Sequence, residues 1–361
     1  MVDIVLLILG LVLFVALVVF HELGHAIAAK RNGVDVDEFG VGFPPRAWKK
    51  KLKNGTLLSL NWLPIGGFVR LKGEHDAAEG AGTYGGASLW VKTKILLAGV
   101  TINWLTAAAI FTLLALVGLP KMLPNQFTIP SDTTVIKSDV RVVVVENSPA
   151  AKAGLQTGDL IKSFAGQTVT TEQQLLDLTR ANAGQTQPLV FVRNNKEQQV
   201  TVTLNAEQGN QGYLGVGPIA QTWQRSTWSA PIVGLGVTVQ FTYETFKGLA
   251  GTVASLLQAK FAEAGQNVAG PVGIFSILKE SSTSGIIPVM FLIGIISLTL
   301  AVMNVLPIPA LDGGRLFVTL LFRLLKKQLT KEREEAIQTA GFAFLMLLVL
   351  VITIVDVRRF F

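Results

Sequence analysis

The 361-residue chain contains no cysteine, only three histidines, and few charged residues, which make up 15% of the total. The missing thiols exclude disulfides, a cysteine nucleophile and thiolate metal ligands, so any bound metal must be held by His, Asp or Glu. Half of the residues are hydrophobic and the mean hydropathy is +0.49. Such a composition is too apolar for an ordinary soluble domain and indicates a membrane protein.

The net charge of +7 raises the question of a nucleic-acid partner. In a membrane protein, basic loops held on the cytoplasmic side account for such a charge. We therefore expect a lipid bilayer, and no nucleic acid, among the partners.

Four stretches are long and apolar enough to cross a bilayer, which takes roughly 20 residues. They fall in residues 1–30, 94–120, 286–322 and 336–356. The first is expected to be retained rather than cleaved as a signal peptide, because Asp3 stands where a signal peptide carries basic residues.

Basic residues predict the orientation of these spans. Eleven Lys and Arg lie between Lys30 and Lys94, and six more lie between Arg315 and Arg333. Both segments are expected on the cytoplasmic side, which leaves the middle of the chain on the extracytoplasmic side.

Residues 126–205 differ in character, with polar residues, short β-like runs and glycine turns. Arg141–Val145 predicts a strand, and Pro188–Val192 with Gln199–Leu204 predicts a closing hairpin. The string VVVVENSPAAKAGLQTGDLIKSFAGQTVTT resembles the PDZ domains of bacterial membrane and periplasmic proteases. That resemblance implies an inserted extracytoplasmic α/β domain that binds extended peptide.

Residues 211–285 follow with apolar positions at helical spacing and scattered charges. This pattern predicts an amphipathic helical region on the outer membrane surface, and a fifth short span is the alternative.

The end of the first span reads HELGH. On a helix, His21 and His25 are four residues apart and share one face, so both imidazoles can reach one Zn²⁺, while Glu22 lies beside them to accept a proton from water. Burying such groups in an apolar helix without a function is costly.

Catalytic zinc takes three protein ligands and leaves one position open. His75 lies in the polar loop GEHDAAEG and is expected to be solvated. The motif NVLPIPALDGG ends an uncharged stretch with Asp312, which is either a ligand or a helix-end residue at the membrane interface. Pro307 and Pro309 are expected to interrupt the helix, and the following glycines permit tight turns. Irregular backbone at membrane depth requires a covered or water-filled cavity, as a hydrolase does.

With HELGH in the first span, NVLPIPALDGG in the third, one PDZ-like insert, and GPVGI at residues 270–274, the chain resembles the site-2 protease family of intramembrane zinc metalloproteases. The resemblance covers nearly the whole chain. It implies that His21, His25 and Asp312 bind Zn²⁺ and that Glu22 is the general base. It further implies substrate contacts at Asn304 and Pro307.

Residues 31–93 are expected to form a cytoplasmic, membrane-associated β-region. Asn54-Gly55 predicts a hairpin, and Gly66-Gly67 a second bend. Family members are similar here, and the resemblance implies that an open strand edge near Gly66 and Gly67 binds unwound substrate. The alternative is a plain interfacial hairpin anchored by Trp48 and Trp62.

The expected fold is thus a polytopic α-helical membrane protein of about four transmembrane helices with a β-hairpin region and a PDZ-like insert. The expected activity is zinc-dependent hydrolysis of single-span membrane proteins, of the anti-sigma-factor or remnant-signal-peptide type, after a prior cut by another protease. The PDZ-like domain is expected to bind peptide C-termini or to obstruct bulky substrate domains, and the location is a bacterial cytoplasmic membrane. The alternatives are a non-enzymatic PDZ scaffold with a structural metal site, and a zinc transporter, against which the uncharged fourth span argues.

Overall fold

The computed structural model describes residues 2–137, 139–193, 196–209, 212–219, 222–258, 260 and 269–360. The chain divides into two compact units. The first, which we call the membrane unit, comprises Met1–Val117, Phe127–Ile129 and Ser226–Phe361. The second, which we call the insert unit, comprises Gly118–Gln126 and Pro130–Arg225.

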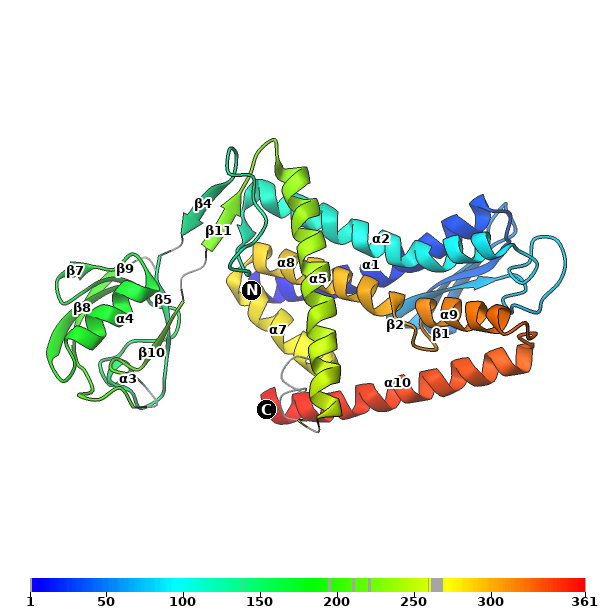
Figure 1. Ribbon diagram of the computed structural model, residues 1–361. Helices are drawn as coiled ribbons and strands as arrows, with labels where there is room; N and C mark the ends of the chain where they lie inside the picture. Colours follow the sequence, from blue (N-terminus) through cyan, green and yellow to red (C-terminus); the bar gives the residue numbers. More distant parts are fainter. Residues whose placement is uncertain are drawn as a thin grey trace. The chain divides into compact units, whose positions relative to one another are not determined.

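Helices make up most of the membrane unit (Figure 1). They are α1 Val2–Arg31, α2 Leu89–Val117, α5 Ala230–Leu257, α7 Pro271–Ser284, α8 Ile286–Val305, α9 Asp312–Leu324 and α10 Lys331–Phe360. Within the described residues, α1, α2, α8 and α10 are long and apolar enough to cross a membrane. The shortest, α8, has 20 residues, which at about 1.5 Å per residue span roughly 30 Å of hydrocarbon. The prediction of about four transmembrane helices is confirmed.

Residues 211–285 contain α5 and α7, while Ala259 and residues 261–268 lie outside the described part. Helix α5 packs on the membrane-crossing helices through aromatic rings. The Phe241 ring centroid lies 5.8 Å from that of Phe111 on α2 and 5.9 Å from that of Phe291 on α8. These contacts hold α5 against the bundle.

Two long bent strands, β1 Val36–Lys51 and β2 Leu57–Leu71, form the β-region of the membrane unit. Residues 38–41 of β1 pair with 57–60 on one side and with 67–70 on the other, so the two strands build a sheet of four segments. The bends occur near Gly42 and Gly66, whose φ angles of 79° and 87° favour glycine. The hairpin predicted at Asn54-Gly55 and the bend predicted at Gly66 are both confirmed.

Glu38 lies at the centre of this sheet with its carboxylate fully buried. Arg46 donates hydrogen bonds of 2.9 and 2.7 Å to it, Ser59 donates one of 2.8 Å, and Arg70 donates another of 2.8 Å. The Arg46 hydrogen bonds are the main cause that lowers the pKa of Glu38 below its ordinary value. Burial raises this pKa, but the Ser59 hydrogen bond and the Arg70 charge lower it further.

The helix interruption predicted at Pro307 and Pro309 is confirmed. Helix α8 ends at Val305 and α9 begins at Asp312, with Ala310 at a φ of 76° between them. A Cβ on Gly313 or Gly314 would overlap the backbone of residues 305–308, so the tight turn requires glycine at both positions. This turn brings Asp312 to the start of a new helix.

The GPVGI motif has a structural role. It begins α7, whose N-cap residue Gly270 makes no side-chain hydrogen bond. The buried Asp356 of α10 supplies the cap instead, because its Oδ2 accepts a hydrogen bond of 2.8 Å from the Gly273 backbone N–H. A Cβ at Gly270 would lie 2.8 Å from Asp356 Oδ2, so glycine permits this close approach.

The main sheet of the insert unit has the strand order β10-β5-β6-β8-β9, with β7 paired to β6. The strands are β5 Arg141–Val144, β6 Leu160–Phe164, β7 Gln167–Thr168, β8 Thr186–Arg193, β9 Lys196–Thr203 and β10 Val216–Ile219. The helices α3 Pro149–Lys152 and α4 Glu172–Ala181 complete it, and Phe164, Leu175 and Phe191 are buried in its core. The closing hairpin predicted from the sequence is β8 and β9.

Strand β10 pairs with β5 although it lies beyond residue 205. A second, three-stranded sheet of the insert unit consists of β3 Leu119–Pro120, β11 Thr222–Arg225 and β4 Thr134–Lys137. The insert unit therefore uses chain on both sides of residues 126–205.

Candidate metal centre and active site

Three side-chain atoms able to bind a metal converge in the membrane unit. His21 Nε2 lies 3.2 Å from His25 Nε2, and Asp312 Oδ2 lies 3.1 Å from the first and 3.3 Å from the second. Within the described residues, no other set of three His, Cys, Asp or Glu side chains converges in this way. The two sequence motifs, almost 290 positions apart, thus meet at one point.

These separations fit zinc. Tetrahedral zinc holds nitrogen and oxygen ligands at about 2.0–2.1 Å, which sets any two ligands about 3.3 Å apart. Asp312 Oδ2 is buried and has no hydrogen-bond donor among the described residues, so a cation shared with the imidazoles is the partner that would satisfy it. Two imidazoles and one carboxylate also leave a fourth coordination position free.

Helix α1 sets the position of both imidazoles. His21 and His25 lie one turn apart on its buried face, whereas Phe20, Leu23 and Ile27 lie on the other side and are 38–45% exposed. The apolar face suits contact with lipid. The polar face points toward α2 and α9.

Gly99 of α2 makes room for the two imidazoles. A Cβ at this position would lie 2.5 Å from His25 Nε2 and 2.6 Å from His21 Cε1. Gly24 of α1 is equally constrained, since its Cβ would lie 2.8 Å from the Ala98 carbonyl oxygen. The two glycines let the α1 and α2 backbones approach closely, as small residues do at helix contacts in membranes.

The second nitrogen of each imidazole also has a neighbour on α2. His25 Nδ1 lies 2.7 Å from the Ile95 carbonyl oxygen, an acceptor that fixes the ring with Nε2 toward Asp312. His21 Nδ1 lies 3.4 Å from the side-chain amide of Asn103.

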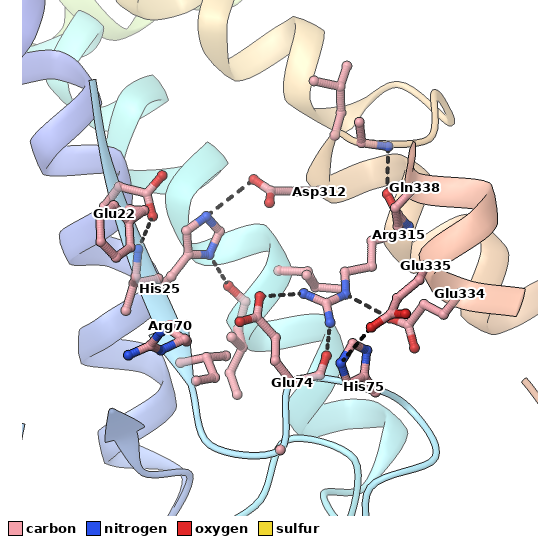
Figure 2. A pocket seen from close by; sticks show the side chains of 18 residues that line it. Glu22, His25, Arg70, Glu74, His75, Asp312, Arg315, Glu334, Glu335 and Gln338 are labelled. Atoms are coloured by element: carbon pink, nitrogen blue, oxygen red, sulfur yellow. Dashed lines mark hydrogen bonds and ion pairs between the residues drawn. The ribbon is translucent and has the colours of Figure 1, made fainter. Parts of the chain in front are cut away.

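Asp312 is held by hydrogen bonds around its turn (Figure 2). Gln338 of α10 accepts a hydrogen bond of 2.6 Å from the Ala310 backbone N–H. Arg315, one helical turn after Asp312, binds Glu74 at 2.9 Å and Glu334 at 3.2 Å. The turn that carries Asp312 is therefore tied both to α10 and to the loop after β2.

Tyr84 lies beneath this network with its ring fully buried. The Arg315 guanidinium carbon is 4.8 Å from the ring centroid, and Lys92 Nζ is 5.4 Å from it. Lys92 in turn forms an ion pair with Asp76. Burial raises the pKa of the Tyr84 hydroxyl, so the ring stays neutral and attracts both cations through its π-system.

Glu22 lies next to His21 on α1 and is directed toward the sheet. Its Oε2 accepts a hydrogen bond of 3.0 Å from the backbone N–H of Val69 (Figure 2). Gly67, in the same outer segment of β2, would carry a Cβ 3.6 Å from Glu22 Cγ. The edge of the sheet thus passes directly beside the candidate base.

A cavity of about 640 Å³ joins these groups. Its walls come from α1, α2, the outer segment of β2, the loop at residues 73–75, the turn before α9, and α10. Glu22, His25 and Asp312 line it. Four residues were expected to contact substrate, namely Asn304, Pro307, Gly66 and Gly67. None of the four is among the residues that line this cavity. Asn304 Nδ2 instead donates a hydrogen bond of 3.0 Å to the Leu300 carbonyl of its own helix.

Sequence reasoning missed several residues that surround the site. Asn103 gave one signal, because it is a polar residue inside an apolar span. Arg315 gave another, since it directly follows the LDGG sequence. Gly99 resembles other glycines of membrane helices, and Gln338 lies on a helix with no motif, so only the tertiary structure identifies them.

A multi-pass helical membrane protein in which two histidines of an HExxH motif meet an aspartate is a membrane-embedded zinc metalloprotease. The model of peptidase family M50 matches residues 9–348. The chain belongs to peptidase family M50, and it carries the β-rich insert unit in addition to its membrane helices.

Several relatives match along nearly their whole length. A protein of Clostridium acetobutylicum is 30% identical over 354 residues, which cover 97% of this chain and 96% of the relative. The zinc metalloprotease RasP of Geobacillus kaustophilus is 27% identical over 430 residues, covering 97% of each chain. The regulator of sigma-W protease RasP of Bacillus subtilis is 26% identical over 434 residues, covering 97% of this chain and 98% of the relative.

Among solved structures, the PDZ domain of an SdrC-like protein from Listeria innocua is similar to part of this chain. It is 29% identical, covers 23% of this chain and 93% of that domain, and has a TM-score of 0.20.

Proposed function

We propose that this metalloprotease hydrolyses peptide bonds in or near the transmembrane segment of single-span membrane proteins, after another protease has shortened them. The observation that carries the proposal is the convergence of His21, His25 and Asp312 beside a cavity lined by Glu22, His25 and Asp312, whose walls include a membrane-crossing helix and a sheet edge. The name of the Bacillus subtilis relative, a regulator of sigma-W, supports an anti-sigma factor as one substrate type, with remnant signal peptides as the other.

His21, His25 and Asp312 would hold the zinc. When bound, zinc supplies a Lewis acid that polarises the scissile carbonyl and lowers the pKa of water. Glu22 takes the proton of the attacking water and passes it to the leaving amine. The Val69 N–H holds the Glu22 carboxylate in place before the reaction.

The outer segment of β2, residues 67–71, is the proposed docking edge for substrate. A transmembrane helix protects its own peptide bonds, so hydrolysis requires extended backbone, and a free strand edge can pair with it. Gly67 keeps this edge free of a side chain beside Glu22, and Gly66, at the bend before it, is proposed to contact substrate as well. Asn304 and Pro307 are proposed to contact the scissile peptide, which requires that the Asn304 amide leave the Leu300 carbonyl.

The orientation proposed from the basic loops sets the β-region and α9 on the cytoplasmic side of a bacterial cytoplasmic membrane, and the insert unit outside. There the PDZ-like domain selects substrates, either by obstructing bulky outer domains or by capturing a newly exposed C-terminus. We favour obstruction, because membrane confinement already supplies a high local substrate concentration.

Replacement of residues 130–225 by a short Gly-Ser linker separates these two modes. This deletion removes β5 and β10 together. A deletion of residues 126–205 would remove β5 but keep β10, which would then lack its partner strand. Obstruction predicts that the deletion variant cuts untrimmed substrate and still cuts trimmed substrate. Capture predicts slower cleavage of the trimmed form, and unchanged cleavage of both forms contradicts selection by this domain.

The proposed activity is tested with the purified full-length protein and a trimmed single-span substrate in detergent or liposomes. Mass spectrometry of the products should locate the cut in or near the transmembrane segment. His25→Ala is the matched control, since it removes one zinc ligand and should leave the substrate intact. A cut far from the membrane segment, or equal cleavage by His25→Ala, contradicts the proposal.

A further inference from the structure

The imidazoles of His21 and His25 have different hydrogen-bond partners at Nδ1, the ring nitrogen that faces away from Asp312. His21 and His25 both direct Nε2 toward Asp312. A neutral imidazole that binds a metal through Nε2 carries its proton on Nδ1, so each Nδ1–H needs an acceptor. The Ile95 carbonyl serves His25 at 2.7 Å. No backbone carbonyl among the described residues bonds His21 Nδ1, whose neighbour is the Asn103 amide.

Asn103 is positioned to be that acceptor. Its side chain is buried, and one end of its amide lies 3.4 Å from His21 Nδ1. Its other end, Oδ1, has no hydrogen-bond partner in the described part of the chain. A half-turn of the amide exchanges the two ends, which directs Oδ1 at the His21 Nδ1–H and removes the conflict between two donors.

We propose that Asn103 is a positioning residue whose amide oxygen accepts the His21 Nδ1–H and thereby holds Nε2 on the zinc. The inference rests on the ligand set of the proposed function. His25 is held by a backbone carbonyl and His21 by a side chain, so the Nδ1 acceptor of His21 is the one that a side-chain substitution can remove.

The backbone of Asn103 is itself anchored. Its carbonyl oxygen accepts a hydrogen bond of 2.8 Å from the Ser297 hydroxyl of α8, and Ser297 is fully buried. Asn103 is therefore held in place at the contact between α2 and α8. A residue that positions a metal ligand needs such a fixed backbone.

The test measures zinc dissociation constants of the full-length protein by competition with a fluorescent chelator. Asn103→Leu, which keeps the size but removes the acceptor, should weaken zinc binding about 10- to 100-fold. Asn103→Asp keeps an acceptor oxygen and should bind zinc within about threefold of the parent. Thr101→Ala, on an exposed part of α2, should leave the zinc dissociation constant unchanged.

The outcomes separate this role from simple packing. Unchanged zinc affinity in Asn103→Leu overturns the inference, and so does an equal loss in Asn103→Asp and Asn103→Leu. The reference variant His25→Ala should lose zinc binding. If it binds zinc as the parent does, the ligand set of the proposed function is wrong and the role of Asn103 falls with it. Failure of the parent to cut a membrane substrate, with these zinc constants as expected, leaves the inference standing.

Discussion

Substitution of Gly99 by alanine should damage the metal site without touching any ligand. The new Cβ would lie 2.5 Å from His25 Nε2 and 2.7 Å from His21 Nδ1, whereas ordinary contact begins at 3.4 Å. At least one imidazole or a helix must therefore move by 0.9 Å, the difference between 3.4 and 2.5 Å. Metal sites hold their ligand distances to about 0.2 Å, so this displacement cannot be absorbed by the ligand geometry.

Overpacking of this kind costs about 1–3 kcal/mol, which corresponds to about five- to 140-fold in an equilibrium constant. We expect Gly99→Ala to weaken zinc binding by this factor, measured by chelator competition on purified protein. Gly248→Ala is the matched control, because a Cβ at Gly248 of α5 meets no atom within 4 Å. An unchanged zinc dissociation constant in Gly99→Ala would refute the close packing of α2 on the two imidazoles.

Further predictions concern orientation, pH and helix capping. Because the chain has no cysteine, single cysteines can be labelled without background. An impermeant maleimide should label Gln167→Cys on intact cells, but Lys51→Cys and Lys327→Cys only after lysis. The reverse pattern contradicts the proposed orientation. Glu38→Gln should lower the melting temperature at pH 7. Since the folded pKa of Glu38 is lowered, its ionised form stabilises the fold above the ordinary pKa of 4.5, and the difference from the parent should shrink as the pH falls below that value. Asp356→Leu should lower the melting temperature more than Asp356→Asn, which keeps an acceptor for the α7 N-terminus; equal losses would argue against the cap.

Local chemistry explains what the sequence could predict. The spacing of His21 and His25 depends only on the pitch of a helix, and the break at Pro307 and Pro309 depends only on missing donors and fixed φ angles. The Asn54-Gly55 turn is equally local. Each of these features can be read without knowledge of the rest of the chain.

Features that depend on long-range packing could not be predicted in the same way. The sequence left Asp312 as either a ligand or an interfacial residue until the resemblance was considered, because its approach to His21 depends on how α8, α9 and α1 pack. Gln338 supports the turn before Asp312 through a single hydrogen bond from another helix. The segments of the β-region also exceed a simple hairpin, since residues 38–41 pair on both sides.

The expected substrate contact at Asn304 illustrates a different limit. A family resemblance implies a role during the reaction, whereas the side chain here bonds the Leu300 carbonyl of its own helix. A polar residue near a helix end can bond a carbonyl of the preceding helical turn. Its proposed role therefore requires a rotation that the sequence gives no means to predict.

The most direct test of the account compares Glu22→Gln with the parent in two measurements, zinc content and cleavage of a trimmed single-span substrate. Glu22 is not one of the three converging ligands, so the variant should bind zinc as the parent does. It should cut the substrate about 10²- to 10⁴-fold more slowly, because the attacking water loses its general base. Cleavage by zinc-loaded Glu22→Gln at the parent's rate would contradict the central claim that Glu22 carries the proton transfer at this site.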